Sequence, residues 1–120
     1  MVQAGEVVDG SATVFLIKIM TFTGGSRIGE SRWKSCNETF PFSALEITAS
    51  SLTLKTRLND VLHFERAEIT SLNIISGLFS YGLRLNHSKN DAAPYVVFWI
   101  FRPKQLKDAL ELNGWQINQG

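Results

Sequence analysis

The sequence predicts a mainly β fold, either a β-barrel or two orthogonal antiparallel sheets, closed by one C-terminal α-helix. Short apolar segments separated by turn-forming residues fill residues 12–101, and several alternate with the period of two that a half-buried strand requires. An amphipathic segment follows, with Pro103 suited to its first helical position and Gly114 suited to its C-terminus. The length of 120 residues indicates a single domain, residues 1–120.

The N-terminal third holds the least regular pattern. Residues 1–11 show no periodicity and predict a flexible arm, whereas residues 12–22 are rich in β-branched and aromatic side chains and predict a strand. Residues 23–26 include two consecutive glycines, which we expect to break that strand. Residues 27–41 are polar with isolated bulky side chains, so we expect a long loop with a short edge strand around Trp33.

The middle of the chain gives the clearest strand signals. Leu45 and Ile47 alternate with less apolar residues, as do Leu52 and Leu54, so residues 43–57 predict a hairpin. Further strands are expected at the ranges 61–66, 69–75, 81–86 and 95–101, with a bend near 66–68 and a polar loop over 87–93.

The predicted helix begins at Pro103 and must dock on the sheet, because a single short helix is not stable alone. Its apolar face comprises Leu106, Ala109 and Leu110, and Lys107 and Glu111 are expected to face solvent. Beyond Gly114, Trp115 and Ile117 are expected to fold back as apolar anchors.

Composition and charge indicate which partners and which compartment to expect. The net charge is +1, which argues against nucleic acid as a partner. Cys36 is the single cysteine, and the N-terminus lacks the basic and then apolar pattern of a signal peptide, so we expect a cytoplasmic protein without disulfides. Only 19% of residues are charged, while eight are Phe and three are Trp. This balance indicates either apolar surface used for self-association or for a partner, or an aromatic-rich β core.

The sequence holds no recognisable catalytic or metal-binding motif. His63, His87 and Cys36 lack the spacing of a metal site, and neither a phosphate-binding loop nor a nucleophile elbow is present. Alternation directs His63 outward, and His87 falls in the polar loop, so both are expected to be solvated. We therefore expect no enzyme activity and no cofactor.

Two groups of cations are candidate contacts for an anion or a lipid head group. Arg27, Arg32 and Lys34 surround Trp33 in the predicted loop, and an aromatic ring among cations suits a phosphate or a membrane interface. Lys55 and Arg57 project from one face of a strand. The alternative interpretation is a solvated loop with one buried tryptophan.

The apolar segment 95–101 predicts a homo-oligomer. It is apolar on both parities, and a closed barrel takes only one set of side chains inward. If the helix covers the other set, the apolar surplus moves to the N-terminal segment, which makes Phe15, Ile17 and Ile19 the candidate oligomer interface.

The order LEITASSLTLKT, VLHFERAEITSLNI, YGLRLNH, YVVFWIF and PKQLKDALELNGW, within residues 40–116, resembles the pleckstrin-homology-like and GRAM-like barrel domains of the bacterial type. This resemblance implies seven strands in two near-orthogonal sheets with one C-terminal helix. The spaced basic residues of phosphoinositide-binding members are not found in the first hairpin, and Trp115 follows the helix instead of lying within it.

The resulting hypothesis is a non-enzymatic interaction module of PH-like fold that acts through self-assembly or protein binding. A peripheral adaptor for anionic membrane lipids and a carrier of a small apolar ligand are the alternatives. The fold itself does not choose between them, because function resides in sites and not in the fold.

Overall fold

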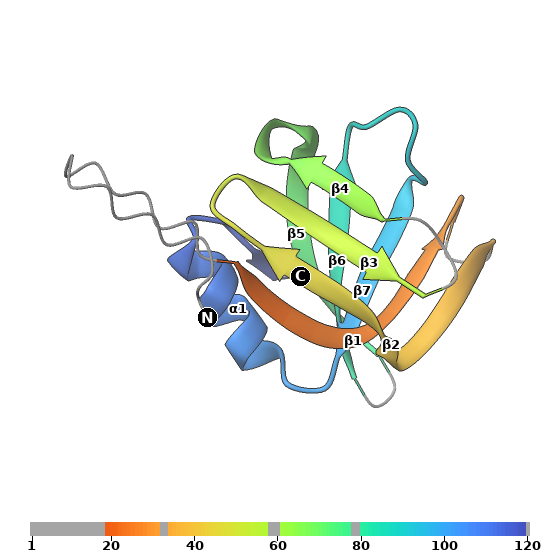
Figure 1. Cartoon of the computed structure of the whole chain (residues 1–120), viewed down its shortest axis with the longest axis horizontal. Coiled ribbons are helices and arrows are strands. Elements are labelled where there is room, and N and C mark those ends of the chain that lie inside the picture. Colours follow the sequence, from red (N-terminus) through yellow and green to blue (C-terminus); the bar gives the residue numbers. More distant parts are fainter. Residues whose placement is uncertain (1–18, 32–33, 58–60, 78–79, 120) are drawn as a thin grey trace, which may run out of the picture.

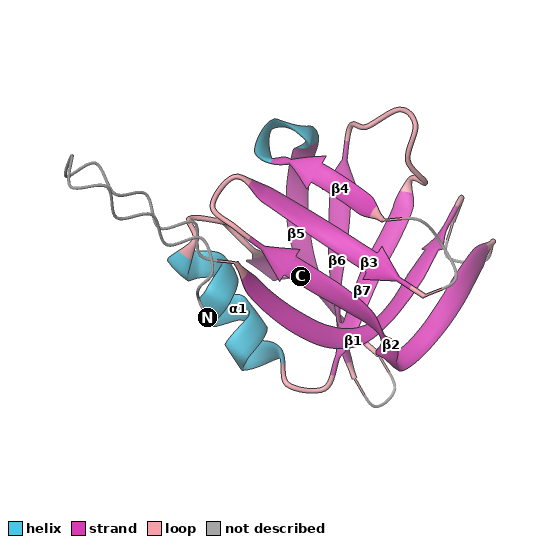
Figure 2. Ribbon diagram, viewed as in Figure 1, coloured by secondary structure: helices cyan, strands magenta, loops and turns pink. Residues whose placement is uncertain are grey.

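The computed structural model describes residues 19–31, 34–57, 61–77 and 80–119. One sheet with the strand order β4-β3-β2-β1-β7-β6-β5-β8 curls into a half-barrel (Figures 1 and 2). Neighbouring strands are antiparallel except the two-residue β8, which lies parallel to β5. The strands are β1 Met20–Gly29, β2 Ser35–Ile47, β3 Ser51–Thr56, β4 Leu62–Glu65, β5 Ile69–Ser76, β6 Tyr81–His87, β7 Tyr95–Ile100 and β8 Asn118–Gln119.

The helix α1, Pro103–Leu112, lies at one end of the curled sheet (Figure 2). The mainly β fold class with one C-terminal helix is therefore confirmed. Leu106, Ala109 and Leu110 are buried in the core, as predicted, and Gly114 adopts a φ of 82° at the end of the helix. Positive φ favours glycine, which ends helices in this conformation.

The residues after the helix also match the prediction. The indole of Trp115 is buried, and its Nε1–H donates a 2.8 Å hydrogen bond to the Thr48 carbonyl. Ile117 packs against the core. On the outer side of the helix, Lys104 forms an ion pair with Asp108 at 2.9 Å. Glu111 is exposed, as predicted, whereas Lys107 is partly buried and does not fully face solvent.

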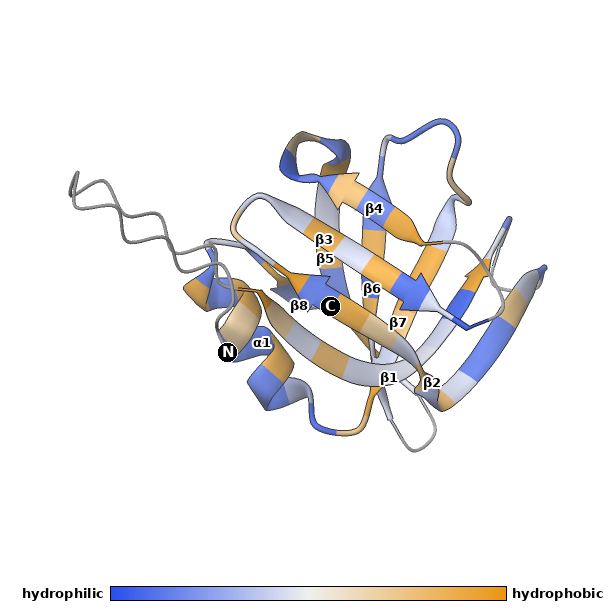
Figure 3. Ribbon diagram, in the orientation of Figure 1, coloured by the Kyte–Doolittle hydropathy of each residue, from blue (hydrophilic) through white to orange (hydrophobic). Residues whose placement is uncertain are grey.

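The hairpin of β2 and β3 confirms the predicted alternation. Leu45, Ile47, Leu52 and Leu54 are all fully buried, and apolar and polar residues alternate along β3 and β4 while β7 is mostly apolar (Figure 3). Strands β5, β6 and β7 lie where they were expected, and a short 3-10 helix, Arg66–Glu68, makes the predicted bend.

The prediction that residues 23–26 break the first strand is wrong. β1 runs through both glycines from Met20 to Gly29, with a register irregularity between Gly24 and Ser26. A Cβ atom at Gly24 would clash with the backbone carbonyl oxygen of Trp99 and would lie 2.9 Å from Cζ of Phe98. Glycine is therefore required here because β1 passes close to the backbone and a core side chain of β7, and not because the chain turns.

The predicted long loop over 27–41 is also wrong. Residues 27–29 of β1 pair with residues 35–37 of β2, so the two strands form a hairpin with a short connection. The first half of β2 is largely hydrophilic (Figure 3), and for this reason the sequence pattern did not indicate a strand there. Residues 39–42 bulge outward, because the register passes from Ser26–Glu38 to Gly24–Ser43 and leaves these four residues opposite Gly25 alone.

Several predictions fall on residues outside the described ranges. These are the flexible arm at 1–11, the first part of the strand at 12–22, and the candidate interface residues Phe15 and Ile17. Ile19 is described and is exposed. In the part of the chain that the structure describes, no helix is both long enough and apolar enough to cross a membrane.

Candidate binding surface on the outer face of the sheet

Strand β7 has two faces that are both covered, but by different means. Val96 and Phe98 point into the core, so alternation places Tyr95, Val97 and Trp99 on the outer face. Tyr95 and Val97 are nevertheless buried. On this face Arg27 of β1 and Arg84 of β6 are the cross-strand neighbours of Val97. The aliphatic part of an arginine side chain can cover apolar surface of this kind.

Trp99 forms the next position along this face. Its cross-strand neighbours are Gly25 and Gly82, and Cβ atoms built on Gly82 and Gly77 would lie 2.9 and 2.8 Å from Cζ3 of the indole. Because Gly77 and Gly82 have no side chains, the Trp99 indole can occupy the space beside them. Trp99 is partly buried, and it lines two pockets on this face.

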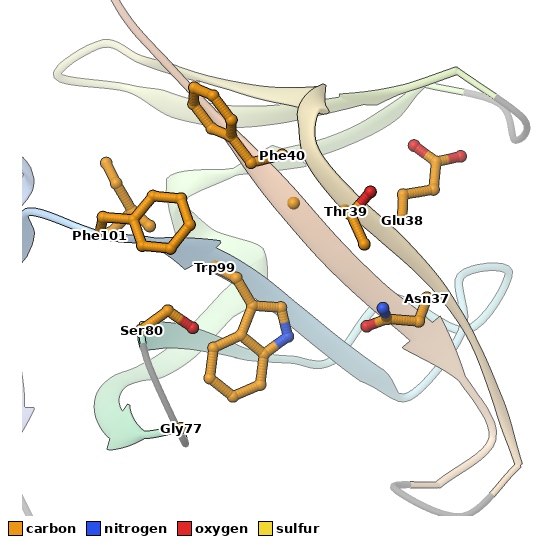
Figure 4. Close-up of a pocket in the computed structure, with 10 residues that line it drawn as sticks. Asn37, Glu38, Thr39, Phe40, Gly77, Ser80, Trp99 and Phe101 are labelled. Atoms are coloured by element: carbon orange, nitrogen blue, oxygen red, sulfur yellow. The ribbon is translucent and has the colours of Figure 1, made fainter.

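A groove opens between Trp99 and the bulge of β2. We call it the aromatic groove; it encloses ≈ 310 Å³, and its lining includes Thr39, Phe40, Ser80, Trp99, Ile100 and Phe101. The rings of Phe40 and Phe101 meet edge to face, with centroids 5.6 Å apart at 66°. Both side chains are about half exposed, at 51% and 55%. Figure 4 shows these two rings on one side of the groove and the Trp99 indole on another.

A second hollow adjoins the aromatic groove. We call it the arginine hollow; it encloses ≈ 410 Å³, and its lining includes Arg27, Arg84, Tyr95 and Trp99. The groove and the hollow share Asn37, Gly77 and Trp99. No carboxylate is among the described residues that line the hollow. An apolar site and a cationic site are thus contiguous on the outer face of the sheet.

The structure describes two of the four residues that the sequence grouped around Trp33. Arg27 lies in β1 and not in a loop, which corrects its predicted place, and Lys34 is exposed at the end of the β1–β2 connection. Arg32 and Trp33 lie outside the described residues. Lys55 forms an ion pair with Glu46 at 2.8 Å, and Arg57 lies 4.8 Å from the ring centroid of Phe42.

Beneath the bulge, Glu38 is a buried carboxylate that the sequence analysis did not single out. It accepts hydrogen bonds from the Ser43 hydroxyl and from the Arg57 backbone N–H, each at 3.0 Å. Ser43 is in turn 2.8 Å from the Ser26 hydroxyl. Figure 4 shows the carboxylate pointing away from Trp99. Glu38, which also lines the aromatic groove, therefore ties the base of the bulge to β3.

The histidines do not share one environment. His63 is exposed, as predicted; its Nε2–H donates to Glu65 at 2.5 Å, and its Nδ1 lies 2.7 Å from the Thr53 hydroxyl. These three groups lie on the surface of β3 and β4, and none of them lines a described pocket. We therefore interpret Thr53 and His63 as a cross-strand pair, to which Glu65 adds a contact along β4.

The expectation that His87 is solvated in a loop is wrong. It ends β6 and packs 4.6 Å from the ring of Phe64, with its Nε2–H donating to the Ala93 carbonyl. Cys36 is exposed. Among the described residues, no group of three His, Cys, Asp or Glu side chains could hold a metal ion.

No protein-family model matches this sequence, and a comparison with curated proteins finds none that matches. The structure establishes the architecture: a curled sheet of seven antiparallel strands, to which the two-residue β8 adds in parallel, with one C-terminal helix.

Proposed function

We propose that this chain is a non-enzymatic interaction module of PH-like architecture that binds a segment of another protein in the aromatic groove. The observation that carries the proposal is the groove itself. The exposed rings of Phe40 and Phe101 and the partly buried indole of Trp99 line it together. The order of seven antiparallel strands followed by one helix supports the PH-like assignment.

The aromatic side chains of the groove are suited to protein recognition. Phe40 and Phe101 pack against each other, yet each leaves about half of its surface in water. Covering such surface contributes about 25 cal/mol for each Å², and buried aromatic anchors dominate many protein interfaces. The aromatic groove, at ≈ 310 Å³, is at the lower end of the range of small-molecule sites, roughly 300–1,000 Å³. A groove of this size suits one or two side chains of a partner.

The charge of the surface identifies the kind of segment. The groove continues into the arginine hollow, where Arg27 and Arg84 face no described carboxylate. A partner segment that carries an apolar side chain next to an acidic one complements both parts of this surface.

The two other functions fit the structure less well. Each cation near an anionic membrane surface contributes roughly 1 kcal/mol of attraction. The described candidate cations Arg27, Lys34 and Lys55 come from three different elements, and Lys55 is already paired with Glu46. A carrier needs an interior cavity, whereas Phe64, Phe98 and the leucines around them are fully buried and fill the core.

Self-association through the start of β1 is a second candidate. Ile19 and Leu112 are both exposed, and a shallow groove of ≈ 450 Å³ lined by Met20, Phe22 and Leu112 lies beside them. A second copy of the chain would cover this groove, continuous with the interface predicted for residues 12–22. Sedimentation velocity of the Leu112→Asp variant tests this: a wild-type dimer that becomes a monomer supports it, and a monomeric wild type contradicts it.

A selection from random peptides displayed on phage tests the main proposal. The wild-type chain should enrich peptides that share an aromatic or aliphatic residue, and their affinity for the Phe40→Ser/Phe101→Ser double variant should fall at least about ten-fold, or ~1.4 kcal/mol. Val61→Ser is the matched control, because Val61 is as exposed as Phe101 and does not line the groove. Enrichment of no common sequence, or equal binding by the double variant, would refute the proposal.

A further inference from the structure

The two arginines of the hollow have an unusual environment. The Nε atoms of Arg27 and Arg84 are both shielded from water, and neither has a hydrogen-bond partner among the described residues. Neither arginine forms an ion pair with a described carboxylate. A buried N–H of a charged group without an acceptor is costly, because it loses water and receives nothing in exchange.

The register places these two arginines on one face of the sheet, in the two strands on either side of β7. Arg27 and Arg84 lie on either side of Val97 in adjacent strands, and neighbouring strands are about 4.8 Å apart. Their Cα atoms are therefore separated by only about 10 Å, two strand spacings. Both side chains line the same hollow, so their positive charges repel each other unless an anion lies between them.

One of the two arginines is already held in place. The guanidinium of Arg84 lies 4.9 Å from the ring centroid of Tyr95, a cation–π arrangement that restricts its rotation. The Asn37 side chain, which belongs to the same lining, brings amide donors to the hollow. The site is thus partly organised before any ligand arrives, which reduces the ordering cost of binding.

We infer that the arginine hollow is an oxyanion site that binds a carboxylate of the protein segment docked in the aromatic groove. Arginine presents a planar fork of N–H donors that matches a carboxylate. Because the hollow and the groove share Asn37, Gly77 and Trp99, the carboxylate belongs to a residue within a few positions of the apolar anchor. For the identity of its occupant, this inference rests on the proposed function.

The first experiment uses simple anions and needs no peptide. The side-chain Nε–H signals of Arg27 and Arg84 in a ¹⁵N-labelled chain are expected to exchange slowly with water, because these atoms are shielded. Acetate should shift both signals in a saturable manner, whereas chloride at equal ionic strength should not. Arg27→Gln and Arg84→Gln should each abolish the shift at the other arginine, while the control Arg57→Gln should leave it unchanged.

Three results of these measurements would overturn the inference. The first is that acetate shifts neither arginine. The second is that phosphate saturates the site where acetate does not, which would identify a phosphate site. Binding of the chain to vesicles of phosphatidylserine and phosphatidylcholine that requires both arginines would identify a lipid head group as the occupant.

The peptide selection separates this inference from the proposed function. Peptides enriched by the wild type should contain Asp or Glu near the apolar residue, and the Arg27→Gln/Arg84→Gln double variant should select the apolar residue without the acidic one. If both chains enrich apolar peptides with no acidic preference, the function stands and the oxyanion site is refuted. If acetate binds but no peptide is enriched, the protein segment is refuted as the occupant.

Discussion

The guanidinium group of Arg66 lies over the indole of Trp115, 4.4 Å from the ring centroid. Its Nη1 donates to the Ala49 carbonyl at 2.6 Å, and its Nη2 donates to the Gly114 carbonyl. One side chain from the bend between β4 and β5 thus joins the β2–β3 turn to the end of helix α1. A cation at this position also complements the negative end of the helix dipole.

The Arg66→Gln substitution should destabilise the fold by about 1 kcal/mol, because it removes the charge, the stacking on Trp115 and the fork of donors. Urea denaturation followed by circular dichroism measures the change. Lys104→Gln is the control, because the Lys104–Asp108 pair is an exposed i, i+4 ion pair worth about 0.5 kcal/mol or less. Equal effects of the two substitutions would show that Arg66 does not join these segments.

Docking of the helix is tested by two leucines within α1. Leu110 is fully buried and Leu112 is 71% exposed. Leu110→Ala should cost about 2–5 kcal/mol in the free energy of unfolding, whereas Leu112→Ala should change it by less than about 0.5 kcal/mol. Chemical denaturation measures both, and a silent Leu110→Ala would contradict the placement of the helix on the sheet.

Glu38 should stabilise the base of the β2 bulge. Glu38→Ala leaves the Ser43 hydroxyl and the Arg57 N–H without this acceptor, and unsatisfied buried donors cost about 1–3 kcal/mol. Glu46→Ala, which removes only the surface ion pair with Lys55, should cost about 0–1 kcal/mol. Thermal or urea unfolding distinguishes the two, and a loss no greater for Glu38→Ala than for Glu46→Ala would count against this role.

The glycines beneath Trp99 should control the shape of the groove. A Cβ at Gly82 would lie 2.9 Å from Cζ3 of the indole and 2.9 Å from Cγ1 of Val97, so Gly82→Ala should displace Trp99. The indole N–H signal of Trp99 in a ¹⁵N spectrum should move, and peptide affinity should fall. Thr70→Ala, at an exposed position of β5, should leave both unchanged; an unmoved indole signal in Gly82→Ala would contradict this packing.

Local patterns were sufficient for the parts of the fold that depend on local chemistry. The β2–β3 hairpin was predictable because Leu45, Ile47, Leu52 and Leu54 alternate over a single buried face. The helix was predictable from Pro103 and Gly114, whose backbone preferences mark its two ends. The β1–β2 hairpin was not predictable. Gly24 allows β1 and β7 to lie close together and does not mark a turn, and the first half of β2 is polar.

The binding surface could not be predicted from local patterns, because it depends on which strands become neighbours. Phe40 and Phe101 meet only after β2 bulges and the chain passes the end of β7. Arg27 and Arg84 share a hollow only because β1 and β6 both pair with β7 in the register that brackets Val97. Arg27 was singled out in the sequence, but as a loop residue, whereas it lies in β1.

The most direct test of the binding surface is a ¹⁵N titration of the full chain with a peptide from the selection. The account predicts that the indole N–H of Trp99 and the Nε–H signals of Arg27 and Arg84 shift together and saturate with one dissociation constant. The Phe40→Ser/Phe101→Ser variant should weaken all three shifts in parallel. Shifts confined to other surfaces, such as those around Leu112 or Arg57, with Trp99 unmoved, would contradict the account.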